Sequence, residues 1–298
     1  MSYVPGVRAV LRTRVITALV MLAVLYAATA WLPPFAFALF ISAVLLVAVH
    51  EWSGLMGLTQ NLHKALYLVV FAVLMAGLSQ PLGLRPAAVA LDREGVLVVC
   101  GLGVLFWLFA FTLLKAYPDN RDRWTGVGKT AVIGFLTLLP TWCALIQLKY
   151  LEPRGYLVLA LVGLVSIVDI GAFFVGRRFG KSKLAPKLSP QKSWAGFWGG
   201  MASCLLLSLV LLYPMHQWVQ PLDVSTAVAL VVMGLVVAVF SVVGDLFESM
   251  LKRSQGLKDS GRSLPGHGGV LDRIDSLTAA APVFVFFLMI LVDDLAWQ

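Results

Sequence analysis

Three aspartates near the end of the chain stand where ionisable side chains are rare. Asp245 follows 21 uncharged residues, 224–244, and Asp272 and Asp275 stand three residues apart at the start of the last apolar run. A charge at the edge of so long an apolar segment is costly unless it meets a cation, a partner or water. A few carboxylates, completed by water and phosphate oxygens, suit Mg²⁺, so the three acids predict a magnesium and triphosphate site. Capping of a helix N-terminus is the alternative, and it would explain one of the last two aspartates.

Charged residues continue the helical pattern beyond Asp245. Glu248, Ser249, Lys252 and Arg253 follow it, and spacings of three and four residues put most of these side chains on one helix face. We therefore expect the helix of the preceding apolar run to continue past Asp245 and to carry acids and bases together.

A glycine-rich loop follows, from residue 258 to residue 269. Its glycines and its proline exclude a regular helix and bare the backbone N–H groups, which can cradle phosphate. Point charges and planar guanidinium forks suited to phosphate oxygens come from Lys252, Arg253, Lys258 and Arg262. A basic loop facing anionic lipid headgroups is the alternative. The glycine density favours the phosphate interpretation.

A second polar patch lies earlier in the chain. Asp169 interrupts the apolar run 157–175, and the segment 177–193, which includes Lys192, is strongly basic. A buried carboxylate needs a partner, and the basic loop would suit nucleotide phosphates or lipid headgroups. Topology alone explains the loop almost as well. His50 and Glu51, with no second acid nearby, are interpreted as boundary residues of the second apolar run.

The elements that position these residues are membrane helices. Hydrophobic residues make up 60% of the chain and charged residues 13%, which is far from soluble composition. Because a span needs roughly 20 apolar residues, we predict an all-α polytopic membrane protein in one membrane domain, 1–298. Its N-terminal helical part is 1–150 and its catalytic part 151–298. The nine predicted spans are 15–32, 35–50, 65–83, 95–114, 128–147, 155–176, 194–213, 224–245 and 277–292.

The basic residues divide unevenly between the two sides of this arrangement. With the N-terminus inside, 19 of the 23 Lys and Arg residues fall in cytoplasmic segments and 4 on the other side. This bias predicts an N-in, C-out orientation. The net charge of +8 is then explained by topology and anionic lipid, and no nucleic-acid partner is expected.

The residues from 249 to 275 resemble the signature of the phosphatidate cytidylyltransferase family, also called CDP-diglyceride synthases. That signature is Ser-x-apolar-Lys-Arg, four residues, Lys-Asp-x-small, two residues, then apolar-Pro/Gly-x-His-Gly-Gly-apolar-x-Asp-Arg-apolar-Asp. The chain fills it with Ser249, Leu251, Lys252, Arg253, Lys258, Asp259, Gly261, Leu264, Pro265, His267, Gly268, Gly269, Val270, Asp272, Arg273, Ile274 and Asp275. Residues 169–181 and 189–196 are similar to an upstream family segment, with Ser193 where Thr is usual and Ala195 where an acid or amide is.

The resemblance implies an activity and a set of residue roles. Members of this family join phosphatidic acid to CTP with Mg²⁺ and form CDP-diacylglycerol and diphosphate. The lipid phosphate attacks the α-phosphorus in line, so positioning and charge neutralisation carry the catalysis. Asp245 and Asp272 would ligate the metal, and a second metal or K⁺ is left open. The implied catalytic residues are Asp245, Asp272, Asp275, Lys252 and His267, and the implied substrate- and phosphate-binding residues are Ser249, Arg253, Lys258, Arg262, Arg273, Asp169 and Lys192.

Other functions fit parts of the pattern. A CTP-dependent polyprenol or dolichol kinase shares a helical membrane frame and phosphate chemistry. A transporter or channel also places acids within spans, but it predicts related halves, whereas the polar signals here crowd into the second half. An inert scaffold would not need the signature acids. We expect a bacterial inner-membrane enzyme whose site faces the cytoplasm and whose partners are CTP, phosphatidic acid and membrane lipids, with a homodimer left open.

Overall fold

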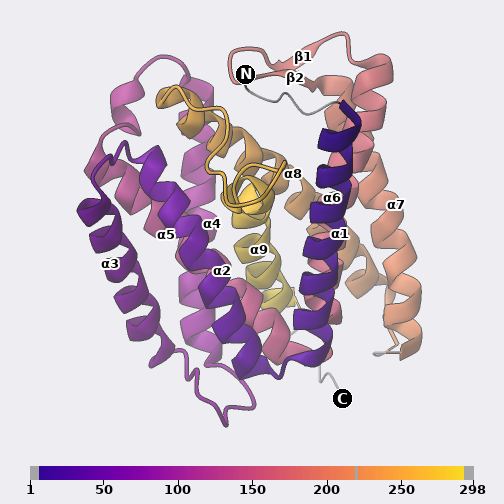
Figure 1. Cartoon of the computed structure of the whole chain (residues 1–298). Coiled ribbons are helices and arrows are strands. Elements are labelled where there is room, and N and C mark those ends of the chain that lie inside the picture. The colour runs from indigo at the N-terminus through magenta and orange to yellow at the C-terminus, as the bar shows by residue number, and fades with distance from the viewer. Residues whose placement is uncertain (1–6, 219–220, 292–298) are drawn as a thin grey trace.

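The computed structural model describes residues 7–218 and 221–291, and this part of the chain folds into a bundle of nine α-helices (Figure 1). The nine predicted spans are confirmed. The helices are α1 Val7–Trp31, α2 Pro34–Leu55, α3 Asn61–Ser79, α4 Arg93–Ala116, α5 Val127–Leu151, α6 Tyr156–Phe179, α7 Trp194–Trp218, α8 Val224–Ser254 and α9 Leu271–Leu291, and a 3₁₀ turn, η1, covers Arg121–Arg123.

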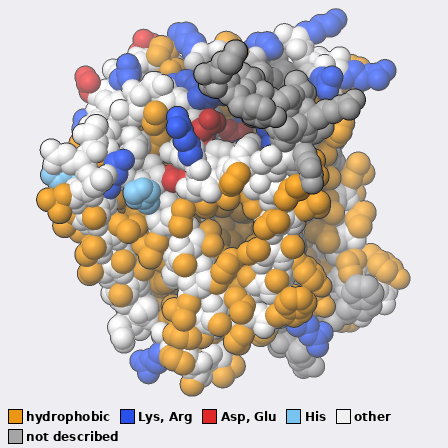
Figure 2. Space-filling view, viewed as in Figure 1, with side chains coloured by type: hydrophobic (Ala, Val, Ile, Leu, Met, Phe, Trp, Pro, Cys, Tyr) orange, Lys and Arg blue, Asp and Glu red, His pale blue; other side chains and the backbone are white. Residues whose placement is uncertain are grey.

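All nine helices are long and apolar enough to cross a membrane. Figure 2 shows a broad band of hydrophobic side chains, with most of the visible Lys and Arg side chains gathered at one end of the molecule. Hydrophobic side chains that would be costly in water are favourable against lipid, so the chain is an integral membrane protein.

Helix α8 is longer than a bilayer core. Its 31 residues extend about 46 Å at a rise of 1.5 Å per residue, whereas the hydrocarbon layer is about 30 Å thick. The uncharged residues 224–244 suffice to cross that layer. The charged turns from Asp245 onward therefore lie at the polar end of the bundle.

The predicted spans are too short where the helices approach this polar end. Helix α2 ends at Leu55 and not at 50, α8 at Ser254 and not at 245, and α9 begins at Leu271 and not at 277. Hydropathy measures burial in lipid, but the backbone hydrogen bonds of a helix continue through charged residues. The continuation of α8 past Asp245 is confirmed.

The basic segment between α6 and α7 contains a small antiparallel hairpin that the helical prediction omits. Strand β1 is Lys183–Ala185 and β2 is Ser189–Ser193, with Lys183 opposite Ser193 and Ala185 opposite Ser189. The hairpin lies at the polar end of the bundle, above α6 and α7 (Figure 1). It folds the predicted basic loop into a defined arm.

Close packing of α6 and α7 fixes the base of this arm. A Cβ atom on Gly196 would lie 2.8 Å from the carbonyl oxygen of Ala172, and one on Gly200 would lie 2.8 Å from that of Val168. Small residues let membrane helices approach in this way. Substitutions at either glycine would push the two helices apart and move the hairpin.

Helices α5 and α9 form the centre of the bundle. The Trp107 Nε1 of α4 and the Thr141 hydroxyl of α5 both donate to the carbonyl oxygen of Thr278 on α9, at 2.9 and 3.1 Å. From α2, the Trp52 Nε1 donates to Thr130 on α5 at 2.9 Å. The first two bonds position α9, which carries two of the predicted acids, against α4 and α5, and the third joins α2 to α5.

Candidate active site

Asp245 meets a lysine from the hairpin. The Lys192 ammonium nitrogen lies 2.5 Å from Asp245 Oδ2, and each side chain keeps about a quarter of its surface exposed, 25% and 27%. One turn along α8, the Ser249 hydroxyl lies 3.5 Å from the other Asp245 oxygen. The hairpin therefore brings a residue from the second polar patch to the first, a contact that the sequence did not predict.

A second lysine joins two acids from different helices. Lys252 Nζ lies 2.7 Å from Asp272 Oδ1 on α9 and 3.4 Å from Glu248 Oε2 on α8. Lys252 is 11% exposed, and the two acids 6% and 5%. Removing one member of so buried a group would leave an uncompensated charge.

Asp272 also organises the loop before it. Its carboxylate accepts hydrogen bonds from the N–H of Ser260, at 3.0 and 3.1 Å, and from the N–H of Gly269 at 2.8 Å. Asp272 therefore holds the loop in place, but the N–H groups that it binds precede α9, so these bonds are not the helix capping considered from the sequence. A metal ligand at this position would be a carboxylate already held in place by the loop.

Glu51, interpreted from the sequence as a boundary residue, is a central member of the site. It is 5% exposed and accepts four hydrogen bonds from the signature loop and the start of α9. The donors are the hydroxyls of Ser260 (3.5 Å) and Ser263 (2.6 Å) and the N–H groups of Val270 (3.0 Å) and Leu271 (2.8 Å). The boundary interpretation was wrong, although the cost of an acid beside an apolar run, applied to Asp245, applied equally here.

Two of the loop glycines are explained by contact with Glu51. A Cβ atom on Gly269 would lie 2.5 Å from Glu51 Oε2, and one on Gly261 would overlap Glu51 Oε1. The N–H groups of Ser260, Gly269, Val270 and Leu271 bind carboxylates. At these four positions the N–H groups hold the loop together, and the predicted phosphate cradle is not formed by them.

Helices α8 and α9 approach closely beside Asp275. A Cβ atom on Gly244 would lie 2.6 Å from the Asp275 carbonyl oxygen. Gly244, Glu248, Asp275 and Thr278 share a cavity of about 10 Å³ with other side chains of the core, which is room for about one water or a monatomic ion. Within the described residues neither Glu248 carboxylate oxygen accepts a hydrogen bond, although the Lys252 ammonium lies 3.4 Å from Oε2 as an ion pair. A buried carboxylate that accepts no hydrogen bond can be stabilised by a bound cation.

These acids are not gathered into a preformed metal cage. Across residues 7–218 and 221–291 there is no group of three or more acidic, histidine or cysteine side chains arranged to hold one ion. The carboxylates of Asp245 and Asp272 are instead each paired with a lysine. A metal here would have to be completed by phosphate oxygens and water.

The remaining predicted residues lie around this group. Arg253 donates to the Leu257 carbonyl oxygen at 3.0 Å, so it joins the end of α8 to the turn that follows it. The backbone N–H of His267 donates to the Leu264 carbonyl oxygen at 3.0 Å and closes a turn in the loop. The ring Nδ1 of His267 is buried without a hydrogen-bond partner in the described part of the chain. The side chains of Arg253, Lys258, Arg262 and Arg273 are exposed. Asp169, which the sequence analysis treats as a buried carboxylate, is exposed as well, so that prediction was wrong.

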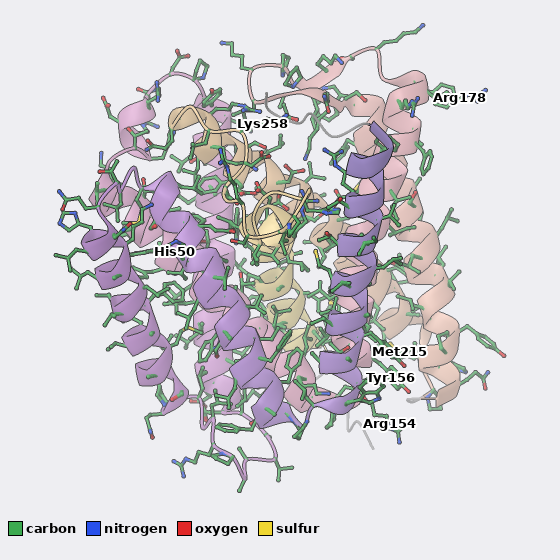
Figure 3. The ribbon with its side chains drawn as sticks, viewed as in Figure 1. His50, Arg154, Tyr156, Arg178, Met215 and Lys258 are labelled. Carbon is green, nitrogen blue, oxygen red and sulfur yellow. The ribbon has the colours of Figure 1, made fainter. Side chains whose placement is uncertain are left out.

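The surface around the acids is basic and opens toward the hydrophobic band. In Figure 2 carboxylates lie between Lys and Arg side chains, and a hollow bordered by hydrophobic side chains lies below them. Figure 3 shows Lys258 at the same polar end, on the loop between α8 and α9. A phosphate-bearing molecule with apolar chains would match both parts of this surface.

Comparisons with known proteins identify the family of this chain. A model of the cytidylyltransferase family matches residues 12–291. The phosphatidate cytidylyltransferase of Pseudomonas aeruginosa is 42% identical over 279 residues, 93% of this chain and 97% of that protein. That of Haemophilus influenzae is 34% identical over 284 residues, 93% and 98%, and that of Bacillus subtilis is 40% identical over 166 residues, 53% and 59%. With its acids and lysines grouped at the polar end of a nine-helix bundle, the chain belongs to the cytidylyltransferase family.

Proposed function

We propose that this chain is a phosphatidate cytidylyltransferase. An oxygen of the phosphatidic acid phosphate attacks the α-phosphorus of CTP, the bond from that phosphorus to the bridging oxygen breaks, and diphosphate leaves. The observation that carries the proposal is the pair of lysine–aspartate contacts, Lys192 with Asp245 and Lys252 with Asp272, at the polar end of an apolar bundle. The relatives named phosphatidate cytidylyltransferase support it over 93% of the chain.

The protein residues act by position and charge. The attacking group is the lipid phosphate, so the protein supplies no nucleophile, and the main cost is to bring two anions together. Lys192 and Lys252 stand where their ammonium groups can turn from carboxylates to phosphate oxygens. The exposed side chains of Lys258, Arg262 and Arg273 add positive charge around the entrance, which offsets the charge of the triphosphate.

We propose Mg²⁺ as the cofactor, bound by Asp245 and Asp272 with Asp275 in support. The donor set fits, because Asp245 is a quarter exposed and within reach of a bound nucleotide, and the neighbouring Glu248 carboxylate accepts no hydrogen bond in the described structure. When bound, Mg²⁺ would neutralise triphosphate charge and orient the phosphates. Lys192 and Lys252 keep the acids paired without it.

We propose that the site faces the cytoplasm of a bacterial inner membrane. The bias of 19 basic residues against 4 supports the N-in orientation, and CTP is a cytoplasmic metabolite. The hydrophobic hollow below the carboxylates in Figure 2 is a path along which the acyl chains would stay in the bilayer while the lipid phosphate reaches Asp245.

The test is incubation of purified protein in lipid micelles with CTP labelled on the cytosine ring, phosphatidic acid and Mg²⁺, followed by lipid extraction. Cytidine label should enter the lipid phase and equimolar diphosphate should form. A polyprenol kinase would instead transfer only the γ-phosphate and leave cytidine in water. Label confined to the aqueous phase at every lipid tested would defeat the proposal.

A further inference from the structure

A large apolar cavity lies in the half of the bundle away from the candidate site. Its volume is about 1010 Å³, the upper end of the range for small-molecule sites. It is lined by the first half of α6, the second half of α7, the beginning of α8 and the end of α9. The site residues occupy the opposite ends of those helices, so the cavity is a separate feature.

The walls leave space that the described protein atoms do not fill. Gly163 of α6 lines the cavity, and a Cβ atom on it would meet nothing within 4 Å. Its other walls are mostly leucines, methionines and small residues, such as Leu164, Leu211 and Met233. Interiors are packed nearly to crystal density, so an unfilled apolar space beside lipid needs an apolar occupant.

The mouth of the cavity carries a cation. The turn between α5 and α6 contributes Glu152, Arg154 and Tyr156 to the lining. Figure 3 shows Arg154 and Tyr156 together at the end of the bundle opposite Lys258, with Met215 close by in the same view. A guanidinium above an apolar cavity is the chemistry of a site for a molecule with an anionic head and apolar chains.

The other charged side chains near this turn already have hydrogen-bond partners. The Glu152 carboxylate accepts the N–H groups of Arg154 and Tyr156, at 3.0 and 2.5 Å. The fully buried Lys149 ammonium donates to the carbonyl oxygens of Pro153 and Thr29. In the described structure the Arg154 side chain is exposed and forms no ion pair. It is therefore the charge of this turn that is available to a ligand.

We propose that this cavity binds an anionic phospholipid, whose chains lie between α6, α7 and α8 and whose headgroup phosphate meets Arg154. The charge at the mouth favours a lipid over a second copy of the protein, since a second copy would have to bring an acidic side chain to Arg154. Flexible acyl chains also fill an irregular cavity better than a helix does. The site is independent of cytidylyl transfer, because it lies at the other end of the helices.

The test compares lipid retention by native mass spectrometry of the full chain, with phosphatidylglycerol and phosphatidylcholine as probes. Arg154→Gln should weaken phosphatidylglycerol binding at least about tenfold, the equivalent of one charge-assisted hydrogen bond, and should change phosphatidylcholine binding little. Gly163→Leu, which places a branched side chain inside the cavity, should reduce both. The matched control is Arg85→Gln, an exposed arginine in another loop at the same end, which should change neither.

The proposal would be overturned if the unaltered chain retained no lipid. It would also be overturned if Arg85→Gln and Arg154→Gln lost phosphatidylglycerol binding equally, or if Gly163→Leu lost a dimer but kept its lipid. Cross-linking with a phosphatidylglycerol that carries a diazirine in its acyl chain should label peptides from residues 156–164 and 207–215. Label confined to other helices would equally contradict it. Cytidylyl transfer measured on the same variants monitors folding separately.

Discussion

The carboxylate of Glu51 accepts a hydrogen bond from the backbone N–H of Leu271, 2.8 Å away and 220 residues later in the chain. The same carboxylate accepts the N–H of Val270 and the hydroxyl of Ser263. One buried acid on α2 thus fixes the point where the loop enters α9. Asp272 is the next residue, so its direction depends on Glu51.

Replacing Glu51 by Gln should lower cytidylyl transfer by at least about tenfold. The amide keeps one acceptor oxygen but turns an NH₂ group toward donors, and each unsatisfied buried donor costs about 1–3 kcal/mol. Because Glu51 positions the loop, kcat should fall and the KM for CTP should rise, while the variant still inserts into membranes. Glu94→Gln, an exposed acid on α4, is the control, and equal kinetics in both variants would contradict the assignment.

Gly269→Ala should damage the same contact from the other side. The added methyl would lie 2.5 Å from Glu51 Oε2, and overpacking of this kind costs about 1–3 kcal/mol. The thermal midpoint in detergent and the transfer rate should both fall. Gly54→Ala is the matched control. Gly54 lies on the same helix as Glu51, and a Cβ atom on it would meet nothing within 4 Å. Combining Gly269→Ala with Glu51→Ala should give less than the sum of the two effects; additive losses would show that the contact is not shared.

Asp245→Asn and Asp272→Asn should both abolish transfer but differ in stability. The Asp245 pair is a quarter exposed, so its loss should change the free energy of unfolding by no more than about 1 kcal/mol. Asp272→Asn leaves Lys252 buried with a weaker partner and should cost roughly 3 kcal/mol. SDS titration in mixed micelles measures the difference. Near-normal turnover in either purified variant would sink the metal assignment.

The sequence was sufficient for those parts of the structure that depend on local pattern. Apolar runs of sufficient length predicted all nine spans, and the spacing of Asp245, Glu248 and Lys252 predicted that α8 continues past the membrane boundary. Both follow from properties of neighbouring residues, namely the length of an apolar run and the helical repeat.

The sequence could not supply contacts between distant segments. Nothing local shows that Lys192 reaches Asp245, because that distance depends on the hairpin and on how closely α6 and α7 pack. Glycine density likewise cannot distinguish N–H groups that bind phosphate from N–H groups that bind a carboxylate of the same protein. In this chain Glu51 and Asp272 bind several of them, and Glu51 comes from a helix more than 200 residues away.

Lys192→Gln tests whether the hairpin lysine serves the reaction or only the fold. Its ion pair with Asp245 is partly exposed, so the free energy of unfolding should change by no more than about 1 kcal/mol. If the ammonium turns to a substrate phosphate, transfer should drop about tenfold or more, since a charge-assisted hydrogen bond contributes roughly twice a neutral one. Lys187→Gln, an exposed lysine of the same segment, should keep normal kinetics. Unchanged transfer in Lys192→Gln would show that the pair only holds the hairpin against α8, and Lys252 would then be the lysine that meets the nucleotide.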